Sequence, residues 1–261
     1  MLEVKNLTTS YFTDDKTNKA IDNISLTVKK GEVVGILGES GSGKSTLGLS
    51  ILRLISPPGK IISGEINFED RDLLKLSENE MIKIRGAKIS MVFQDPFTSL
   101  NPVYTVGEQI AEVIRLHQGL GYREAHKKAI EMLDVVQINY PEARVNDYPH
   151  QFSGGMRQRV MIAMAIACKP ELLIADEPTT ALDVTVQAEI LKLLKKIQQE
   201  YGMGIMYITH NFGIIREICS RVLVMYKGKI VEEGSIDQII NSPKDEYTKR
   251  LIDCLKVLKG A

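Results

Sequence analysis

Residues 33–45 read Val-Val-Gly-Ile-Leu-Gly-Glu-Ser-Gly-Ser-Gly-Lys-Ser, and they give the strongest single indication of the fold. Its first five residues are apolar on both faces, which predicts a buried strand of a parallel sheet. The glycine-rich part fits the pattern of a phosphate-binding loop, after a strand and before a helix. Gly41 and Gly43 allow backbone conformations closed to other residues, so that successive N–H groups converge on phosphate oxygens. A plain glycine turn is the alternative.

The end of this loop supplies side chains for phosphates and for a metal ion. Lys44 offers a positive charge to β and γ phosphates, and Ser45 offers a hydroxyl to Mg²⁺. We therefore predict a nucleotide site here. Its residues are Gly38, Ser40, Gly41, Ser42, Gly43, Lys44, Ser45 and Thr46.

Other apolar runs predict more strands. Residues 172–175 and 205–208 are apolar on both faces and should be buried parallel strands. Residues 222–233 are expected to form a hairpin that turns at Lys227-Gly228. Three further stretches alternate polar with apolar residues, as half-buried antiparallel strands do. They are residues 2–7, 24–28 and 64–68.

Helical patterns replace the strand signals between about 95 and 168, for example over 107–117 and 123–136. Residues 184–201 carry apolar side chains at spacings of three and four, which predicts an amphipathic helix ending at Gly202. Apolar runs with helices between them are typical of a mainly parallel sheet covered by helices. The chain is therefore predicted to be α/β.

The same patterns predict how the chain is organised. Residues 1–261 are expected to form one domain. Within it, 1–94 and 169–261 would make an α/β catalytic core with a β subdomain. Residues 95–168 would be a helical subdomain inserted in that core.

Composition and charge exclude several classes of protein. Lys+Arg 33 and Asp+Glu 33 cancel, so no net charge draws the chain to nucleic acid or to an anionic membrane. The apolar run 160–168 is far shorter than the roughly twenty residues that cross a bilayer. We expect no secretory leader, because residues 1–4 begin directly with alternating sequence. Cys168, Cys219 and Cys254 are too widely spaced for a disulfide framework or a metal pair. We expect a cytoplasmic protein without a nucleic-acid partner.

Asp176 and Glu177 follow the apolar run 172–175 as adjacent carboxylates. Asp176 would hold Mg²⁺ through water, and Glu177, one residue further out, would orient and polarise an attacking water. An isolated Asp-Glu pair at a strand end is more often a solvated loop. Together with the phosphate-binding loop, the pair predicts nucleotide hydrolysis.

Residues 152–156 read Phe-Ser-Gly-Gly-Met and narrow the class further. Ser153 is a natural N-cap ahead of the helical run 157–168, and Gly154 and Gly155 leave the first N–H groups bare. This arrangement predicts a second anion site, which one nucleotide cannot fill together with the first. A capped helix with a flexible entry is the alternative.

With these motifs, the sequence resembles the ATP-binding subunits of ABC transporters over essentially its whole length. The resemblance implies a RecA-like P-loop NTPase fold, with a mainly parallel core, an antiparallel β subdomain and an inserted helical subdomain. It implies ATP and Mg²⁺ as cofactors, with Ser45, Gln94 and Asp176 holding the metal. It also implies a head-to-tail dimer, in which the Ser-Gly-Gly segment of one subunit closes on the γ-phosphate bound by the other.

The remaining elements of that family occur in order. Tyr11 matches the aromatic residue that stacks on adenine, with Phe12 as the other register and core packing as the other role. Gln94 matches the Q-loop glutamine, and His210 matches the switch histidine that contacts the γ-phosphate. Residues 180–183, Thr-Ala-Leu-Asp, match the D-loop, whose Asp183 would act in trans with Ser153, Gly154 and Gly155. The catalytic residues implied are Glu177, His210, Gln94 and Lys44.

Two positions depart from the family pattern. The signature segment usually ends in Gln and here ends in Met156, which offers no amide to ribose or phosphate. The position after the switch histidine is commonly Asp and here is Asn211. Neither departure touches the implied catalytic residues, and the effect of Met156 stays open.

Residues 95–102, 152–159 and 177–187 resemble one group of that family, the oligopeptide, dipeptide and nickel importers. In this group Met156 is normal. The resemblance implies two transmembrane permease subunits at the cytoplasmic face of the membrane, and a solute-binding protein as an indirect partner. It favours a second, different ATPase subunit over a homodimer. Peptide is placed slightly ahead of nickel, and the substrate stays open.

The end of the chain carries a weaker match. Residues 243–249 approximate the group's Pro-x-His-Pro-Tyr-Thr element without its His-Pro. Larger members continue into a cysteine-bearing extension, whereas this sequence stops at Ala261 with only Cys254 nearby. We therefore expect no iron–sulfur cluster.

Two other functions remain as alternatives. A non-transport ABC ATPase acting on DNA or ribosomes would carry coiled-coil insertions, zinc modules or a second cassette. A P-loop kinase would lack the Ser-Gly-Gly segment and the glutamine and histidine switches. Copurification with two hydrophobic subunits would separate the transporter from both.

Overall fold

The computed structural model describes residues 1–13, 16–180 and 182–259, and all their side chains except those of 96–97 and 254–259. Contacts within the chain divide it into two units. Unit 1 comprises Met1–Met81 and Gly204–Ala261, and unit 2 comprises Ile82–Met203. The short helix α2 (Glu78–Ile82) spans the division. Among the helices of the described part, none is both long and apolar enough to span a bilayer.

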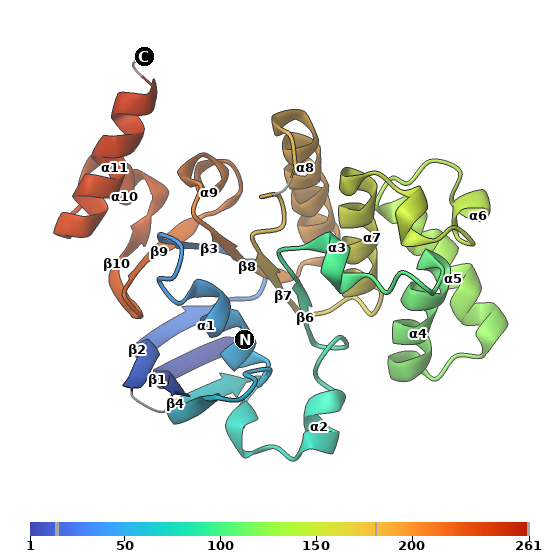
Figure 1. Cartoon of the computed structure of the whole chain (residues 1–261), viewed down its shortest axis with the longest axis horizontal. Coiled ribbons are helices and arrows are strands. Elements are labelled where there is room, and N and C mark those ends of the chain that lie inside the picture. Colours follow the sequence, from blue (N-terminus) through green and yellow to red (C-terminus); the bar gives the residue numbers. More distant parts are fainter. Residues whose placement is uncertain (14–15, 181, 260–261) are drawn as a thin grey trace. The chain divides into compact units, whose positions relative to one another are not determined.

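Unit 1 begins with an antiparallel sheet, visible in blue and teal in Figure 1. Its strands, in spatial order, are β2 (Lys16–Val28), β1 (Leu2–Thr13), β4 (Gly59–Phe68) and β5 (Arg71–Asp72). The three predicted alternating strands are confirmed, but each is longer than its sequence pattern indicates. Register shifts in β1 between Val4 and Leu7, and again before Thr9, break the period-two alternation while pairing continues.

The apolar run at residues 33–37 forms the middle one of three parallel strands in unit 1. Strand β3 (Val33–Leu37) lies between β8 (Gly204–Thr209) and β9 (Arg221–Tyr226) and is parallel to both. Ile36 and Leu37 have no solvent exposure, as expected of a strand covered on both faces. The helices of this unit that follow β3, β8 and β10 are α1 (Lys44–Ile51), α9 (Phe212–Ile218), α10 (Ile236–Asn241) and α11 (Glu246–Lys259).

The predicted hairpin is confirmed. Strand β10 (Lys229–Ser235) pairs antiparallel with β9. Lys227 and Gly228 connect them with φ values of 46° and 78°. A two-residue hairpin turn with both central residues at positive φ matches the right-handed twist of the strands.

Unit 2 contains two parallel strands, β6 (Ile89–Val92) and β7 (Leu172–Asp176). Strand β7 confirms the predicted run at 172–175 and is buried along its whole length. The sequence pattern does not predict β6. Its four residues, Ile-Ser-Met-Val, are too few to show a period and lie directly before the helical region.

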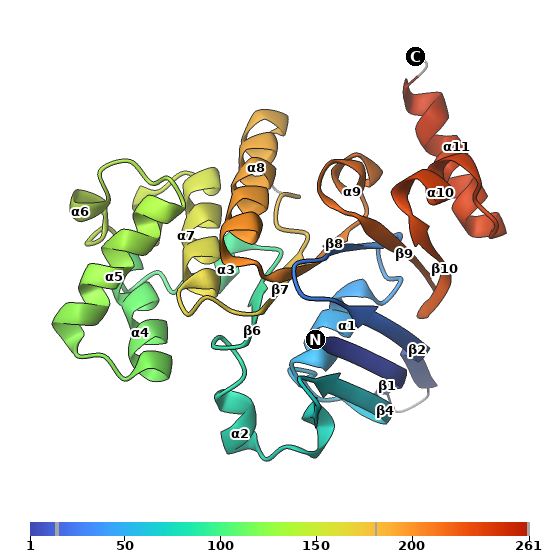
Figure 2. The same cartoon turned by 180° about the vertical axis from the view of Figure 1, so that it is seen from behind.

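Helices make up most of unit 2, and α4, α5 and α7 lie side by side (Figures 1 and 2). The helices are α3 (Pro96–Ser99), α4 (Val106–Gln118), α5 (Tyr122–Val135), α6 (Pro141–Arg144), α7 (Gly154–Ile166) and α8 (Val184–Tyr201). Helix α8 has the predicted bounds and ends at Gly202, whose φ of 61° provides a left-handed C-cap. Helix α7 begins earlier than predicted because Ser153 caps it directly, which places both signature glycines in the first turn.

Candidate functional site

The phosphate-binding loop joins β3 to α1 inside unit 1. Gly41 and Gly43 have φ values of 78° and 103°, as predicted for the loop glycines. A Cβ on Gly43 would lie 2.2 Å from the carbonyl oxygen of Ala20, and one on Gly38 would lie 2.3 Å from that of Met225. Backbone from β2 and β9 therefore closes on the loop, and only glycine fits at these two positions.

Side chains in the loop converge on the same place. Lys44 is 5% exposed, and its Nζ donates to the carbonyl oxygens of Gly38 and Glu39 at 2.8 and 2.9 Å. The Ser42 hydroxyl is buried and has no hydrogen-bond partner among the residues that the structure describes. A buried ammonium and a buried hydroxyl at the N-terminus of α1 fit an anionic ligand such as a phosphate.

Two further predicted residues of unit 1 lie outside the loop. Tyr11 is half-buried, and a Cβ on Gly59 of the neighbouring strand would lie 2.7 Å from Tyr11 Cε1, so the ring lies over that glycine. Phe12, the other register, is 40% exposed. His210 is exposed and directly follows β8. Adenine stacking and the γ-phosphate contact stay predictions for these side chains.

Asn211 shows how one departure from the family pattern is accommodated. Its side-chain oxygen accepts a hydrogen bond from Gly213 N at 2.8 Å and thereby caps α9. Its own N–H donates to Thr209 Oγ1 at 2.9 Å. Asn and Asp are equally good N-caps, so the exchange preserves the local structure that follows His210.

The two carboxylates lie in unit 2, at the end of β7. Asp176 is 5% exposed, and Glu177 has a positive φ of 46°, which turns the chain out of the strand. Gln94 Nε2 donates to Glu177 Oε2 at 3.2 Å. Thr180 Oγ1 donates to the same oxygen at 2.9 Å. The structure thus brings together two of the predicted catalytic residues, Gln94 and Glu177.

Thr180, the first residue of the D-loop match, has no catalytic or binding role in the sequence-based prediction. A usable signal exists, because it follows Glu177 by three residues and a turn closes between them through Thr180 N and Glu177 O at 3.3 Å. A hydroxyl at that spacing can reach back to a carboxylate. Ala181, the next D-loop residue, lies outside the described residues.

The predicted metal ligands have the right chemistry for Mg²⁺. Ser45 offers a hydroxyl, Gln94 an amide oxygen and Asp176 a carboxylate, and oxygen ligands are those that Mg²⁺ takes. Ser45 belongs to unit 1, and the other two belong to unit 2. The donor set therefore fits the ion, and the assignment stays a prediction.

The Ser-Gly-Gly segment packs on the start of α8 within unit 2. Ser153 Oγ accepts a hydrogen bond from Met156 N at 3.4 Å, so the predicted N-cap is confirmed. A Cβ on Gly155 would lie 2.6 Å from Val186 Cγ1, so close packing also requires this glycine. Asp183 caps α8 by accepting from Val186 N at 3.0 Å. The signature and D-loop residues therefore lie next to each other, and their action in trans stays a prediction.

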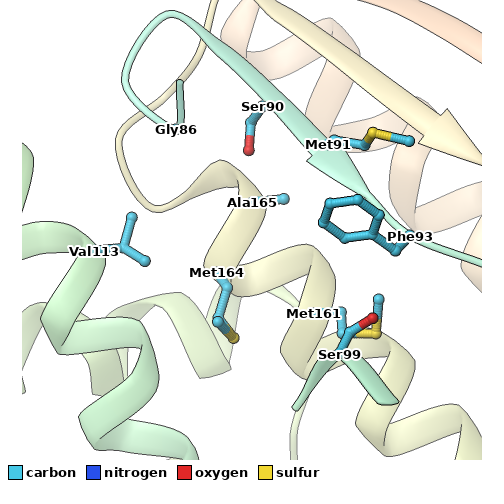
Figure 3. A pocket seen from close by; sticks show the side chains of 9 residues that line it. All are labelled: Gly86, Ser90, Met91, Phe93, Ser99, Val113, Met161, Met164 and Ala165. Carbon is cyan, nitrogen blue, oxygen red and sulfur yellow. The ribbon is translucent and has the colours of Figure 1, made fainter. Parts of the chain in front are cut away.

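A pocket of about 170 Å³ also lies in unit 2, where β6 meets α3, α4 and α7 (Figure 3). Its lining is mostly apolar and includes the ring of Phe93, the residue that precedes Gln94 (Figure 3). The lining residues are Gly86, Ser90, Met91, Phe93, Ser99, Val113, Met161, Met164 and Ala165.

Comparison with protein families gives a match to the model described as "ABC transporter", over residues 21–180. This span includes the phosphate-binding loop, Gln94, the Ser-Gly-Gly segment and the two carboxylates.

Curated proteins match over nearly the whole chain. The probable peptide ABC transporter ATP-binding protein y4tR of Sinorhizobium fredii is 51% identical over 97% of this chain and 76% of its own length. The oligopeptide transport ATP-binding protein AppD of Bacillus subtilis is 48% identical over 100% of this chain and 80% of its own. The glutathione import ATP-binding protein GsiA of Salmonella paratyphi A is 52% identical over 97% of this chain, which spans only 41% of GsiA.

Solved structures give the same result at the level of the fold. The ATP-binding cassette MJ0796, in a dimeric post-hydrolysis state bound to ADP and Pi, matches with a TM-score of 0.80 and 34% identity over 90% of this chain and 99% of its own. The cbiO1 protein of Clostridium perfringens, part of the transporter complex cbiONQ, matches with a TM-score of 0.78 and 30% identity over 100% of this chain and 98% of its own. The predicted P-loop NTPase fold is confirmed.

Proposed function

The chain belongs to the ABC transporter family, and from this premise we propose that it is the ATP-hydrolysing subunit of a transporter that imports peptides. The observation that carries the proposal is the Glu177 carboxylate, held at the end of β7 by hydrogen bonds from Gln94 and Thr180. A carboxylate fixed in this way can orient and polarise a water molecule. The family match supplies the substrate on which that water acts, which is ATP.

The phosphate-binding loop of unit 1 binds the substrate. Lys44 and the backbone N–H groups of the loop take the β and γ phosphates of ATP, and Tyr11 takes the adenine. His210 senses the γ-phosphate. Mg²⁺, when bound by Ser45, Gln94 and Asp176, supplies positive charge that neutralises the phosphate oxygens. The roles of Tyr11, His210 and the metal ligands rest on the family resemblance, and that of the loop also rests on the buried Lys44 and Ser42 described above.

Completion of the site requires a second ATPase subunit. Ser153, Gly154 and Gly155 of one subunit, with its Asp183, close on the γ-phosphate held by the other. A capped helix start whose first residues lack side chains suits this contact, because N–H groups there face an approaching anion. We retain residues 95–168 as a helical subdomain of one ATPase domain, and we favour a different paralogue as the partner.

The loop after Gln94 and the pocket of Figure 3 are the proposed contacts with two transmembrane permease subunits. Val103 and Tyr104, which are adjacent in this loop, are 72% and 53% exposed, and docking surfaces are marked by contiguous exposed apolar side chains. The side chain of Phe97, another candidate contact, lies outside the described residues. The subunit would thus work at the cytoplasmic face of the membrane, as a peripheral protein.

Peptide is the proposed substrate because y4tR and AppD, which this chain covers over most of their length, are named as peptide and oligopeptide transport proteins. Nickel, the other substrate left open by the sequence, has no support among these names. A solute-binding protein would deliver the peptide, and no iron–sulfur cluster or nucleic acid enters the proposal. A non-transport ABC ATPase is the alternative function.

Coexpression with the permease subunits tests the proposal. The chain should copurify with two hydrophobic subunits, and its ATP hydrolysis in vesicles should rise when a peptide-loaded binding protein is added. A binding protein loaded with chelated nickel should give no such rise. ATP hydrolysis that is unchanged by the permease subunits would favour a non-transport ATPase. Stimulation of hydrolysis only by the nickel-loaded binding protein would make nickel, and not peptide, the substrate.

A further inference from the structure

The phosphate-binding loop has one contact that none of the roles above uses. The backbone N–H of Glu39 donates to the hydroxyl oxygen of Tyr247 at 3.2 Å, within unit 1. Tyr247 lies in the first turn of α11, in the tail segment 243–249 that the sequence analysis singled out. The start of α11 is therefore in hydrogen-bond contact with the loop between β3 and α1.

Tyr247 is held in place from several sides. It is 6% exposed, and its ring stacks on Tyr226 of β9 with centroids 4.2 Å apart and planes at 24°. Asp245 Oδ1 accepts from Tyr247 N at 2.8 Å and from Thr248 N at 3.3 Å, which fixes the start of α11. The Tyr247 side chain belongs to a buried cluster with Leu37, Phe212, Ile215, Val222, Val224, Ile239 and Ile252.

A second hydrogen bond carries the contact onward to a ligand-binding side chain. The carbonyl oxygen of Glu39 accepts from Lys44 Nζ at 2.9 Å. The same residue thus gives its N–H to Tyr247 and its carbonyl to Lys44. Because the Tyr247 hydroxyl is fixed, its hydrogen bond limits the backbone rotation of Glu39. The Glu39 carbonyl that accepts from Lys44 is therefore also restricted.

We propose that Tyr247 is a positioning residue, which holds Glu39 so that Lys44 and the phosphate-binding loop are preorganised for ATP. The proposal rests on the proposed function, because it assumes that Lys44 binds ATP. Glycine-rich loops have the largest backbone freedom to lose on binding. A contact that restricts the free loop lowers this cost and therefore strengthens binding.

The chemistry of the tyrosine suits this role. Burial raises the pKa of Tyr247 above its ordinary value. The hydroxyl therefore stays neutral at physiological pH and accepts the Glu39 N–H without adding negative charge beside the phosphates. A charged acceptor at that place would repel the anionic ligand.

Tyr247→Phe tests the proposal because it removes the hydroxyl and keeps the ring stacked on Tyr226. Mg-ATP is titrated into the full-length chain, and KM and kcat are measured on the same preparation. The ATP affinity should fall about fivefold, in line with the loss of the contacts that the hydroxyl makes with the Glu39 N–H and with the Glu39 side chain. The kcat should stay within about twofold, because no group that contacts the reacting water has changed.

Thr248→Val is the matched control. Thr248 is fully buried, adjacent to Tyr247, and its hydroxyl has no partner among the residues that the structure describes. Valine has the same shape, so ATP affinity should equal that of the wild type. Equal losses in the two variants, or wild-type affinity in Tyr247→Phe, would overturn the positioning role.

Lys44→Ala, measured in parallel, separates the positioning role of Tyr247 from the proposed function of the chain. If it abolishes ATP binding while Tyr247→Phe has no effect, the positioning role is wrong and the proposed function stands. If Lys44→Ala itself leaves ATP binding intact, the proposed function fails at this site, and the positioning role fails with it.

Discussion

The two units carry different groups of the proposed site residues and hold them in different ways. In unit 1, most of the contacts come from backbone atoms. The carbonyl oxygens of Ala20 and Met225 lie against Gly43 and Gly38. Carbonyl oxygens of the loop accept hydrogen bonds from Lys44. In unit 2, side chains hold one another at the end of β7, where Gln94 and Thr180 both donate to Glu177. Backbone atoms therefore fix the proposed ligand-binding part, and contacts between side chains fix the proposed hydrolytic part.

This difference predicts that substitutions in the two units have separable effects. A change in unit 1 should weaken ATP binding, and hydrolysis should fall as a consequence. A change at the cluster around Glu177 should slow hydrolysis and leave ATP bound. The following variants either break this separation or measure how complete it is.

Lys44→Ala should have the largest effect on binding. Removal of a buried, hydrogen-bonded ammonium that is proposed to bind phosphate should weaken ATP affinity by at least about a hundredfold. Calorimetric titration with Mg-ATP measures the loss, and the melting temperature without nucleotide serves as the control for folding. Affinity close to that of the wild type would show that unit 1 does not hold the phosphates through this side chain.

Gly43→Ala should have a smaller effect, with Gly41→Ala as its matched control. Both glycines have positive φ, but a Cβ on Gly43 would meet the Ala20 carbonyl at 2.2 Å, whereas one on Gly41 would meet nothing within 4 Å. Gly41→Ala, which carries only the backbone cost of about 1 kcal/mol, should weaken ATP binding by about fivefold, and Gly43→Ala, which adds the clash, by about thirtyfold. Equal losses in the two variants would mean that φ alone, not the close approach of β2, controls the loop.

Thr180→Val should have the smallest effect and should act on hydrolysis alone. Loss of one hydrogen bond to a carboxylate should lower kcat by about three- to tenfold without changing KM. Thr180→Ser retains the hydroxyl and should restore most of the rate in steady-state kinetics. A rise in KM in Thr180→Val would place this residue in the binding half and contradict the separation.

Local motifs made much of the fold predictable from the sequence. The run 33–37 is continuously apolar and ends at a glycine-rich loop, the hairpin is marked by Lys227-Gly228, and the helix 184–201 has a helical period that stops at Gly202. The continuation of β1 to Thr13 was not predictable, because the bulges that bend a strand also interrupt its alternation. Strand β6 was missed because its four residues are recognisable only beside β7.

The candidate site also contains residues that the sequence predicts and residues that it does not. Gln94 and Glu177 were predictable because family motifs mark them, and the structure places them in hydrogen-bond contact. Thr180 and Tyr247 were not assigned to the site, because their roles depend on contacts that a sequence pattern does not contain. Tyr247 lies 208 residues from Glu39, and only the fold of unit 1 brings them together.

Glu177→Gln gives the most direct test of the central claim, that this chain hydrolyses ATP with a carboxylate separable from its binding loop. The amide keeps the shape of the side chain and cannot act as a base for water. Hydrolysis should fall about a thousandfold, while Lys44, Ser45 and Asp176 still hold Mg-ATP and the nucleotide accumulates in a closed dimer. ATP affinity within about threefold of the wild type, with turnover lost, is the predicted result. Wild-type turnover, or loss of ATP binding as severe as in Lys44→Ala, would contradict the account.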